Sequence, residues 1–159
     1  MLAYLSLGSN IGHRRTNLAE AVTQLEGHGQ IVLKSSFYET EPVEMTGQPW
    51  FVNCVVALET QEPPDVLLSS ILEIERKLGR VRQAEQPKGP RSIDIDILLF
   101  GDVVEDSSSL TIPHPAMHER RFVLEPLVEI ASEAFHPVLK MTAQQMLSHL
   151  PFEPVVRKT

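Results

Sequence analysis

The fold assignment depends on residues 51–79, which read FVNCVVALETQEPPDVLLSSILEIERKLG. Residues 51–59 are rich in valine and other apolar residues and are typical of a buried strand. Pro63 and Pro64 then mark the start of a helix. The apolar residues of this helix recur every three or four positions, which places them on one face, and Gly79 marks its end. A strand followed directly by an amphipathic helix is therefore the centre of the predicted fold.

The alternation of strands and helices extends in both directions from this segment. Towards the N-terminus, the sequence predicts strands over residues 1–7 and 31–38, with a helix between them that ends at 27–29. Towards the C-terminus, it predicts strands over 92–100 and 110–112, a helix over 121–130 and a short final helix capped by Thr142. The order β-α-β-β-α-β with additional C-terminal helices indicates an α+β, ferredoxin-like fold with a mainly antiparallel sheet. The length of 159 residues favours a single domain, 1–159.

Composition argues against several classes of protein. The formal net charge of −7 argues against general nucleic-acid binding, which requires many phosphates to be neutralised. Apolar runs are broken by charges well before the roughly 18–20 residues of a membrane span, and the N-terminus lacks the basic region of a signal peptide. The single cysteine, Cys54, lies in an apolar strand and is interpreted as a buried, unreactive thiol of a protein in the reducing cytoplasm.

One segment of this acidic chain is strongly basic. Six of the fourteen Lys and Arg residues fall within residues 76–91. Such a cluster indicates a local site for a polyanion such as a nucleotide, although a solvated, charged surface is the alternative. Arg80, Arg82 and Arg91 carry the planar guanidinium group that suits phosphate binding. Their alternative role is ion pairing with nearby glutamates on the surface.

Two aspartates follow the basic segment, within the predicted strand 92–100. Alternate residues of a strand share a face, so Asp94 and Asp96 point the same way. Two carboxylates on one face of a core strand repel each other and lose hydration, and a divalent cation relieves both effects. Magnesium prefers carboxylate and phosphate oxygens. Together with the arginines, the pair predicts a site for phosphoryl transfer. The alternative is an edge strand whose aspartates face solvent.

Three further features have two interpretations each. His114 lies between two prolines, and either it is structural or, with Thr111, it contacts phosphate or adenine. Asn53 interrupts an apolar strand, and its amide must find partners. It either satisfies a backbone group or binds the edge of a flat heterocycle. The glycine motif at 8–12 matches neither a P-loop nor a dinucleotide-binding motif, and we interpret it as a structural turn.

Six short motifs occur in one order along the chain: GSN at 8–10, FYETEP at 37–42, FVN at 51–53, GRVR at 79–82, GPRSIDIDIL at 89–98 and PHP at 113–115. Together they resemble the 6-hydroxymethyl-7,8-dihydropterin pyrophosphokinase family of bacterial folate biosynthesis. The resemblance covers residues 1 to about 135, and GPRSIDIDIL is its most specific part. The chain departs from the family pattern at Lys88, where tryptophan is common, and at Pro115, which is aromatic in some relatives.

The resemblance implies transfer of the β,γ-pyrophosphoryl unit of ATP to the pterin hydroxymethyl group, with release of AMP. It implies two magnesium ions bound by Asp94 and Asp96, and a monomer, as family members of this size often are. The composition adds a cytoplasmic location and no nucleic-acid or membrane partner. The residues that match catalytic positions are Arg80, Arg91, Asp94 and Asp96. The residues that match pterin contacts are Thr40, Val43, Phe51, Asn53 and Phe122. The residues that match ATP contacts are Glu75, Arg82, Arg91, Ile97, Thr111, His114 and Arg120. Segments 39–50 and 80–91 resemble the family's mobile lids.

Two other hypotheses account for the aspartate pair. One is a different two-metal enzyme such as a nuclease, which the acidic net charge disfavours. The other is a ferredoxin-like binding or regulatory module without catalytic activity, in which the aspartates face solvent.

Overall fold

The computed structural model describes residues 1–41, 50–79, 92–152 and 156–159. The elements in chain order are β1 (Leu2–Ser9), α1 (Arg14–Leu25), the 3-10 turn η1 (Glu26–His28), β2 (Gln30–Lys34), β3 (Tyr38–Thr40), β4 (Phe51–Glu59), α2 (Pro64–Lys77), β5 (Asp94–Phe100), β6 (Glu105–Asp106), β7 (Thr111–Ile112), the 3-10 turn η2 (Met117–Glu119), α3 (Arg121–Ala131), β8 (Phe135–His136), β9 (Met141–Thr142), α4 (Ala143–Ser148) and β10 (Val156–Lys158). Among these described residues, no helix combines the length and apolar character needed to cross a membrane.

The main sheet has the order β10-β3-β4-β1-β5, and β2 pairs with β4 further along the same edge as β3. Every pair in the sheet is antiparallel. Helices α1 and α2 connect strands that are not neighbours in the sheet, which gives the interleaved order of a ferredoxin-like fold. The predicted α+β class with a mainly antiparallel sheet is therefore confirmed.

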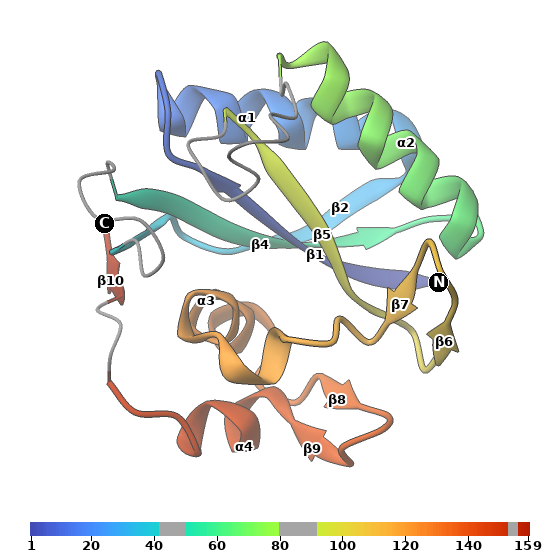
Figure 1. Cartoon of the computed structure of the whole chain (residues 1–159), viewed down its shortest axis with the longest axis vertical. Coiled ribbons are helices and arrows are strands. Elements are labelled where there is room, and N and C mark those ends of the chain that lie inside the picture. Colours follow the sequence, from blue (N-terminus) through green and yellow to red (C-terminus); the bar gives the residue numbers. More distant parts are fainter. Residues whose placement is uncertain (42–49, 80–91, 153–155) are drawn as a thin grey trace.

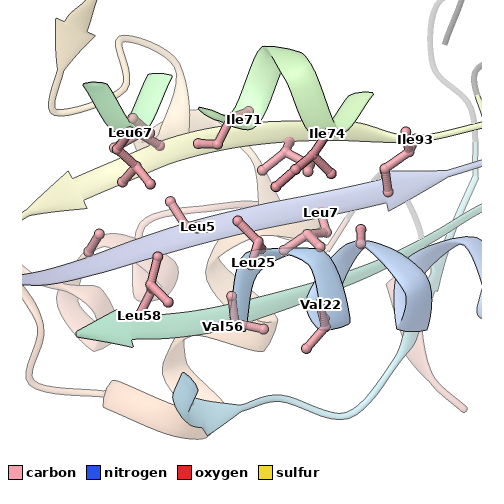
Figure 2. Packing of buried hydrophobic residues seen from close by; sticks show 14 of the residues in the cluster. Leu5, Leu7, Val22, Leu25, Val56, Leu58, Leu67, Ile71, Ile74 and Ile93 are labelled. Carbon is pink, nitrogen blue, oxygen red and sulfur yellow. The ribbon is translucent and has the colours of Figure 1, made fainter. Parts of the chain in front are cut away.

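Helices cover both faces of this sheet (Figure 1): α1 and α2 lie on one side, and α3 and α4 lie on the other. The strands separate their side chains accordingly. In β1, Leu5 and Leu7 are fully buried beneath α1 and α2, whereas Tyr4 packs into the cluster beneath α3. Figure 2 shows Leu25 of α1 and Ile74 of α2 meeting the strand side chains. Burial of each such leucine or isoleucine contributes about 1.5–3 kcal/mol, so both helical layers are held to the sheet mainly by apolar contact.

The predicted helix boundaries agree with the local chemistry. Helix α2 begins with Pro64 in its first turn, and Gly79, with a φ of 89°, follows its end. Thr142 forms a capping box at α4: its Oγ1 accepts from Gln145 N at 3.2 Å, and Gln145 Oε1 accepts from Thr142 N at 2.8 Å. The predicted cap at Thr142 is therefore confirmed.

Two predicted boundaries were wrong. The single strand expected over 31–38 is interrupted, because Ser35 Oγ accepts a hydrogen bond from Val55 N at 2.9 Å in place of a backbone carbonyl. The strand therefore divides into β2 and β3. The turn expected at 8–12 begins later, because Gly8 and Ser9 continue β1 and pair with Asn53 and Val52 of β4. Only the end of that motif, around Gly12 with a φ of 70°, leaves the sheet.

Candidate active site

The aspartate pair lies on β5, and its spacing has the predicted effect. Asp94 and Asp96 are half-buried, whereas Ile95 and Ile97 are each 5% exposed and pack beneath α1 and α2. Leu98, two residues beyond Asp96, belongs to the apolar cluster beneath α3. Both carboxylates therefore lie on the face of the sheet that α3 covers. The side chain of Ile97, which matches an ATP contact, points to the opposite face.

The sequence predicted that the aspartates lie on a strand inside the sheet, but the strand that carries them lies at its edge. Among the described strands, β5 is the last of the main sheet and pairs only with β1. The expectation failed because the residues facing α2 make β5 apolar enough to read as an internal strand. An edge position explains why both carboxylates keep partial exposure, and it leaves them accessible to a cation and to phosphate oxygens from the open side.

A row of residues crosses the sheet from β3 to β5. Its members are Tyr38, Asn53, Gly8 and Asp94, which are paired in that order on four neighbouring strands. Residues directly opposite in an antiparallel pair share a face. Asn53 and Asp94 are thus on one face, two strands and roughly 10 Å apart. In the next row, Ser6 lies between Val55 and Asp96.

Gly8 is the member of this row whose importance the sequence interpretation missed. A Cβ on Gly8 would lie 2.7 Å from Asn53 Nδ2 and 3.7 Å from Phe51 Cδ1. The absence of a side chain therefore gives the Asn53 carboxamide its place over β1. A signal for this was available, because an isolated glycine in a strand pattern often marks a close approach.

Two buried polar atoms beside this row have no hydrogen-bond partner within the described part of the chain. They are Asn53 Oδ1 and Thr40 Oγ1, in residues that are 4% and 3% exposed. Thr40 pairs with Phe51 on the same face of the sheet. Since an unsatisfied buried polar atom is costly, these two are well suited to receive a polar, flat ligand against the Phe51 ring.

The loop after β5 brings His114 near the aspartates. His114 N donates to Leu98 O at 2.9 Å, and His114 Nδ1 accepts from Ala116 N at 3.1 Å. Burial and the positive charge of Arg120 lower the pKa of His114 to about 4, against an opposing effect of Asp94. His114 is therefore neutral near pH 7, and with Nδ1 acting as acceptor its proton lies on Nε2, where it can be donated to a phosphate oxygen.

Helix α3 supplies two of the expected site residues at its start. Arg120 precedes the helix, and its guanidinium lies 5.6 Å from the centroid of the Phe122 ring. Phe122 packs at the margin of the apolar cluster on the site face of the sheet. Thr111 is half-buried in the hairpin of β6 and β7, where it pairs with Asp106.

Glu75 approaches β5 from the face of the sheet opposite to the aspartates, which is also the face of Ile97. It is 4% exposed, on α2, beneath the opposite face of the sheet. Its Oε2 accepts a hydrogen bond from Ile95 N at 2.8 Å, between the two aspartates. This hydrogen bond ties Glu75 to the backbone of β5.

Four expected site residues lie outside the described residues: Val43, Arg80, Arg82 and Arg91. Most of segment 39–50 and all of segment 80–91, which resemble the family's lids, also lie outside them. Among the residues that are described, no three His, Cys, Asp or Glu side chains come close enough together to hold a metal. Magnesium is often bound by one or two carboxylates together with substrate phosphates and water, so Asp94 and Asp96 fit it without a third protein ligand.

Cys54 is fully buried, and burial raises the pKa of its thiol to about 12.

The fold and this face combine a carboxylate pair suited to magnesium with buried polar atoms suited to a flat ligand, an arrangement that fits the class of phosphate-transferring enzymes. The family model for 7,8-dihydro-6-hydroxymethylpterin-pyrophosphokinase (HPPK) matches residues 4–132. The chain therefore belongs to the HPPK family.

Curated relatives agree with this assignment, and solved structures share the fold. The 2-amino-4-hydroxy-6-hydroxymethyldihydropteridine pyrophosphokinase of Bacillus subtilis is 44% identical over 134 residues, which cover 83% of this chain and 79% of that protein. The folic acid synthesis protein fol1 of Pneumocystis carinii is 43% identical over 85% of this chain, which spans only 18% of fol1. The wild-type HPPK-DHPS protein of Plasmodium falciparum has the same fold, with a TM-score of 0.72 at 17% identity over 92% of this chain and 44% of that one.

Proposed function

We propose that this chain transfers the pyrophosphoryl group of ATP to 6-hydroxymethyl-7,8-dihydropterin, giving AMP and the pterin diphosphate, in tetrahydrofolate biosynthesis. The hydroxymethyl oxygen forms a bond to the β-phosphorus and releases its proton to the surrounding water. The bond between that phosphorus and the oxygen bridging it to the α-phosphate breaks, and AMP leaves with the bridging oxygen. The observation that supports this best is the row in which Asn53 and Asp94 face the same side of the sheet across Gly8. It provides a place for a heterocycle at one end and for phosphate at the other.

Asn53 and Thr40 have the chemistry to bind the pterin. The carbonyl oxygen of Asn53 accepts a hydrogen bond from a pterin N–H, and the Thr40 hydroxyl binds a further polar atom. The aromatic rings of Phe51 and Phe122 stack on the heterocycle, and Val43 completes this part of the site. Formation of these hydrogen bonds satisfies atoms that are buried without partners in the described chain.

The other half of the site binds ATP. Asp94 and Asp96 hold two magnesium ions, which neutralise charge on the triphosphate when bound. His114 donates from Nε2 to a phosphate oxygen. Arg80 and Arg91 contact the phosphates that move, and the further contacts come from Arg82, Thr111 and Arg120. Glu75 and Ile97 act on this half of the site from the opposite face of the sheet, Glu75 through its hydrogen bond to Ile95 N and Ile97 through its place in β5. We also propose that residues 1–159 act as one domain, as a cytoplasmic monomer without a nucleic-acid or membrane partner.

The test is incubation with ATP, magnesium and the reduced pterin. AMP is expected to appear in step with pterin consumption. Formation of ADP instead would refute pyrophosphoryl transfer, and absence of turnover would favour a binding module. Release of nucleotides from a polynucleotide substrate would favour a nuclease.

A pair of variants tests the role of the aspartates. Asp96→Ala is expected to lower magnesium-dependent turnover roughly 100-fold or more, since charge neutralisation by the metal is worth several kcal/mol. The matched control is Asp102→Ala, which alters an exposed carboxylate in the turn after β5 and should leave turnover unchanged. Substantial magnesium-dependent activity in Asp96→Ala would refute the metal role.

A further inference from the structure

The C-terminal strand β10 supports the part of the sheet where the pterin is proposed to bind. Val156, Arg157 and Lys158 pair with Thr40, Glu39 and Tyr38 of β3, one residue to one. Strand β3 has only three residues, and β4 is its partner on the other side. Short strands paired on one side alone are marginally stable. With β10 in place, β3 is an internal strand, and the C-terminus lies beside the start of β4 (Figure 1).

Arg157 makes two contacts that join the chain segments on either side of residues 42–49. Its Nη2 donates to Glu39 Oε2 at 3.3 Å, and its guanidinium lies 4.5 Å from the centroid of the Trp50 ring. Glu39 directly precedes Thr40, and Trp50 directly precedes Phe51. One side chain therefore holds the neighbours of two residues that form the pterin half of the proposed site.

The register places Arg157 on the face of the sheet opposite to that site. Arg157 is directly opposite Glu39, which is directly opposite Val52, and Val52 belongs to the apolar cluster beneath α1 and α2. Arg157 therefore does not line the face that carries Thr40 and Asn53, and any effect on the pterin passes through the backbone of β3 and β4.

Other contacts fix the same corner from this opposite face. Arg14 Nη1 donates to Trp50 O, and Arg15 Nη2 donates to Thr159 Oγ1. Thr159 N in turn donates to Phe37 O at 3.0 Å, and the Arg15 guanidinium lies 5.4 Å from the Phe37 ring centroid. The start of α1, the C-terminus and both flanks of the pterin strands are thus linked.

We propose that Arg157 is a positioning residue for pterin binding, which fixes the relative placement of Thr40 and Phe51 by holding Glu39 and Trp50 from behind the sheet. This inference rests on the proposed function. The Arg157 side chain is 62% exposed, so its ion pair adds little to global stability. Its role is therefore separable from folding.

The variant Arg157→Ala tests the proposal. The KM for the pterin is expected to rise about 3- to 10-fold, the equivalent of losing one exposed ion pair and one cation–π contact. The KM for ATP, kcat and Tm should stay close to wild type. Arg157→Lys keeps the charge and should restore part of the pterin affinity. Lys158→Ala is the control, because Lys158 pairs with Glu129 of α3 at 3.8 Å on the other face of the sheet from Arg157.

Trp50 provides a second readout, because it is the only tryptophan in the chain. Loss of the guanidinium should expose its ring to water and shift its emission to longer wavelength in Arg157→Ala, but not in Lys158→Ala. If the wild-type chain forms AMP and Arg157→Ala has an unchanged pterin KM, the positioning role is overturned. A parallel loss of kcat, both KM values and Tm would also overturn it, as a general structural effect. Absence of AMP formation by the wild type would instead refute the proposed function.

Discussion

The carboxamide of Asn53 occupies the space over Gly8, where a Cβ would lie 2.7 Å from Asn53 Nδ2. Gly8 is paired with Asn53 on one side and with Asp94 on the other. The bare backbone of β1 thus separates the proposed pterin and phosphate halves of the site. Any side chain added at this position must displace the Asn53 amide, because the backbone of an internal strand cannot retreat.

Gly8→Ala is therefore expected to impair pterin binding more than ATP binding. Displacing a single hydrogen-bonding amide should raise the KM for the pterin by roughly tenfold, since a misplaced hydrogen bond costs on the order of 1–2 kcal/mol. Steady-state kinetics with each substrate varied in turn measure this. Gly27→Ala is the matched control, because a Cβ at Gly27 would meet no atom of the described residues within 4 Å apart from its own local backbone. An equal rise in both KM values for Gly8→Ala would contradict the prediction.

A pair of buried threonines separates binding from stability. Thr40 Oγ1 has no partner in the described chain, whereas Thr60 Oγ1 donates to His28 O at 2.7 Å and accepts from Glu62 N at 3.1 Å. Thr40→Val should raise the free energy of unfolding by about 1 kcal/mol, because it removes an unsatisfied hydroxyl, and should weaken pterin binding. Thr60→Val should lower that free energy by about 1–3 kcal/mol and leave pterin KM unchanged. Urea unfolding and steady-state kinetics of both variants provide the comparison. Destabilisation by Thr40→Val would show that its hydroxyl has a partner.

Much of the fold follows from the sequence because its signals are local. The apolar period of α2, the proline at its start and Gly79 at its end all act within one element. The capping box at Thr142 is likewise contained within four residues. Strand β4 was predicted with its observed bounds, because a long, internal strand is apolar throughout.

The relations between strands could not be obtained in this way. The break after Lys34 depends on Ser35 bonding to Val55, twenty residues away. Gly8 looked like part of a turn because its neighbours Ser9, Asn10 and Gly12 are turn formers, and only the pairing with β4 and β5 shows its role. The edge position of β5 also depends on sheet order, which local periodicity does not contain.

The hydrogen bond between Glu75 and Ile95 leads to a prediction for the aspartates. Glu75→Leu removes the acceptor for Ile95 N, which costs about 1–3 kcal/mol and loosens the backbone between Asp94 and Asp96. We expect kcat to fall roughly tenfold and the magnesium requirement to rise, because 1 Å of misplacement in a site is costly. Glu75→Gln keeps an acceptor oxygen and should recover most of the activity. The measurement is turnover against magnesium concentration.

The control for this pair is Glu73→Gln, which alters an exposed residue of the same helix paired with Arg76. It should leave both kcat and the magnesium requirement unchanged. If Glu75→Gln loses as much activity as Glu75→Leu, the charge of Glu75 matters rather than its acceptor oxygen. That result would favour a direct role in the nucleotide site over support of β5.

Glu129 gives the attachment of α3 to the sheet a pH dependence. Burial raises the pKa of Glu129, but hydrogen bonds from the Tyr38 hydroxyl at 2.8 Å and from Ser36 outweigh burial and lower the pKa overall. A carboxyl whose pKa is lower in the folded chain than in the unfolded chain stabilises the folded state. The full stabilisation is present above the unfolded pKa of about 4.3, and it is lost as the pH falls through the pKa of the folded chain. Urea unfolding should therefore show lower stability at about pH 3 than at about pH 7. Glu129→Gln should reduce that decrease, and Tyr38→Phe should reduce it in part, because Tyr38 supplies only one of the hydrogen bonds. An unchanged pH dependence in both variants would show that Glu129 is not the group responsible.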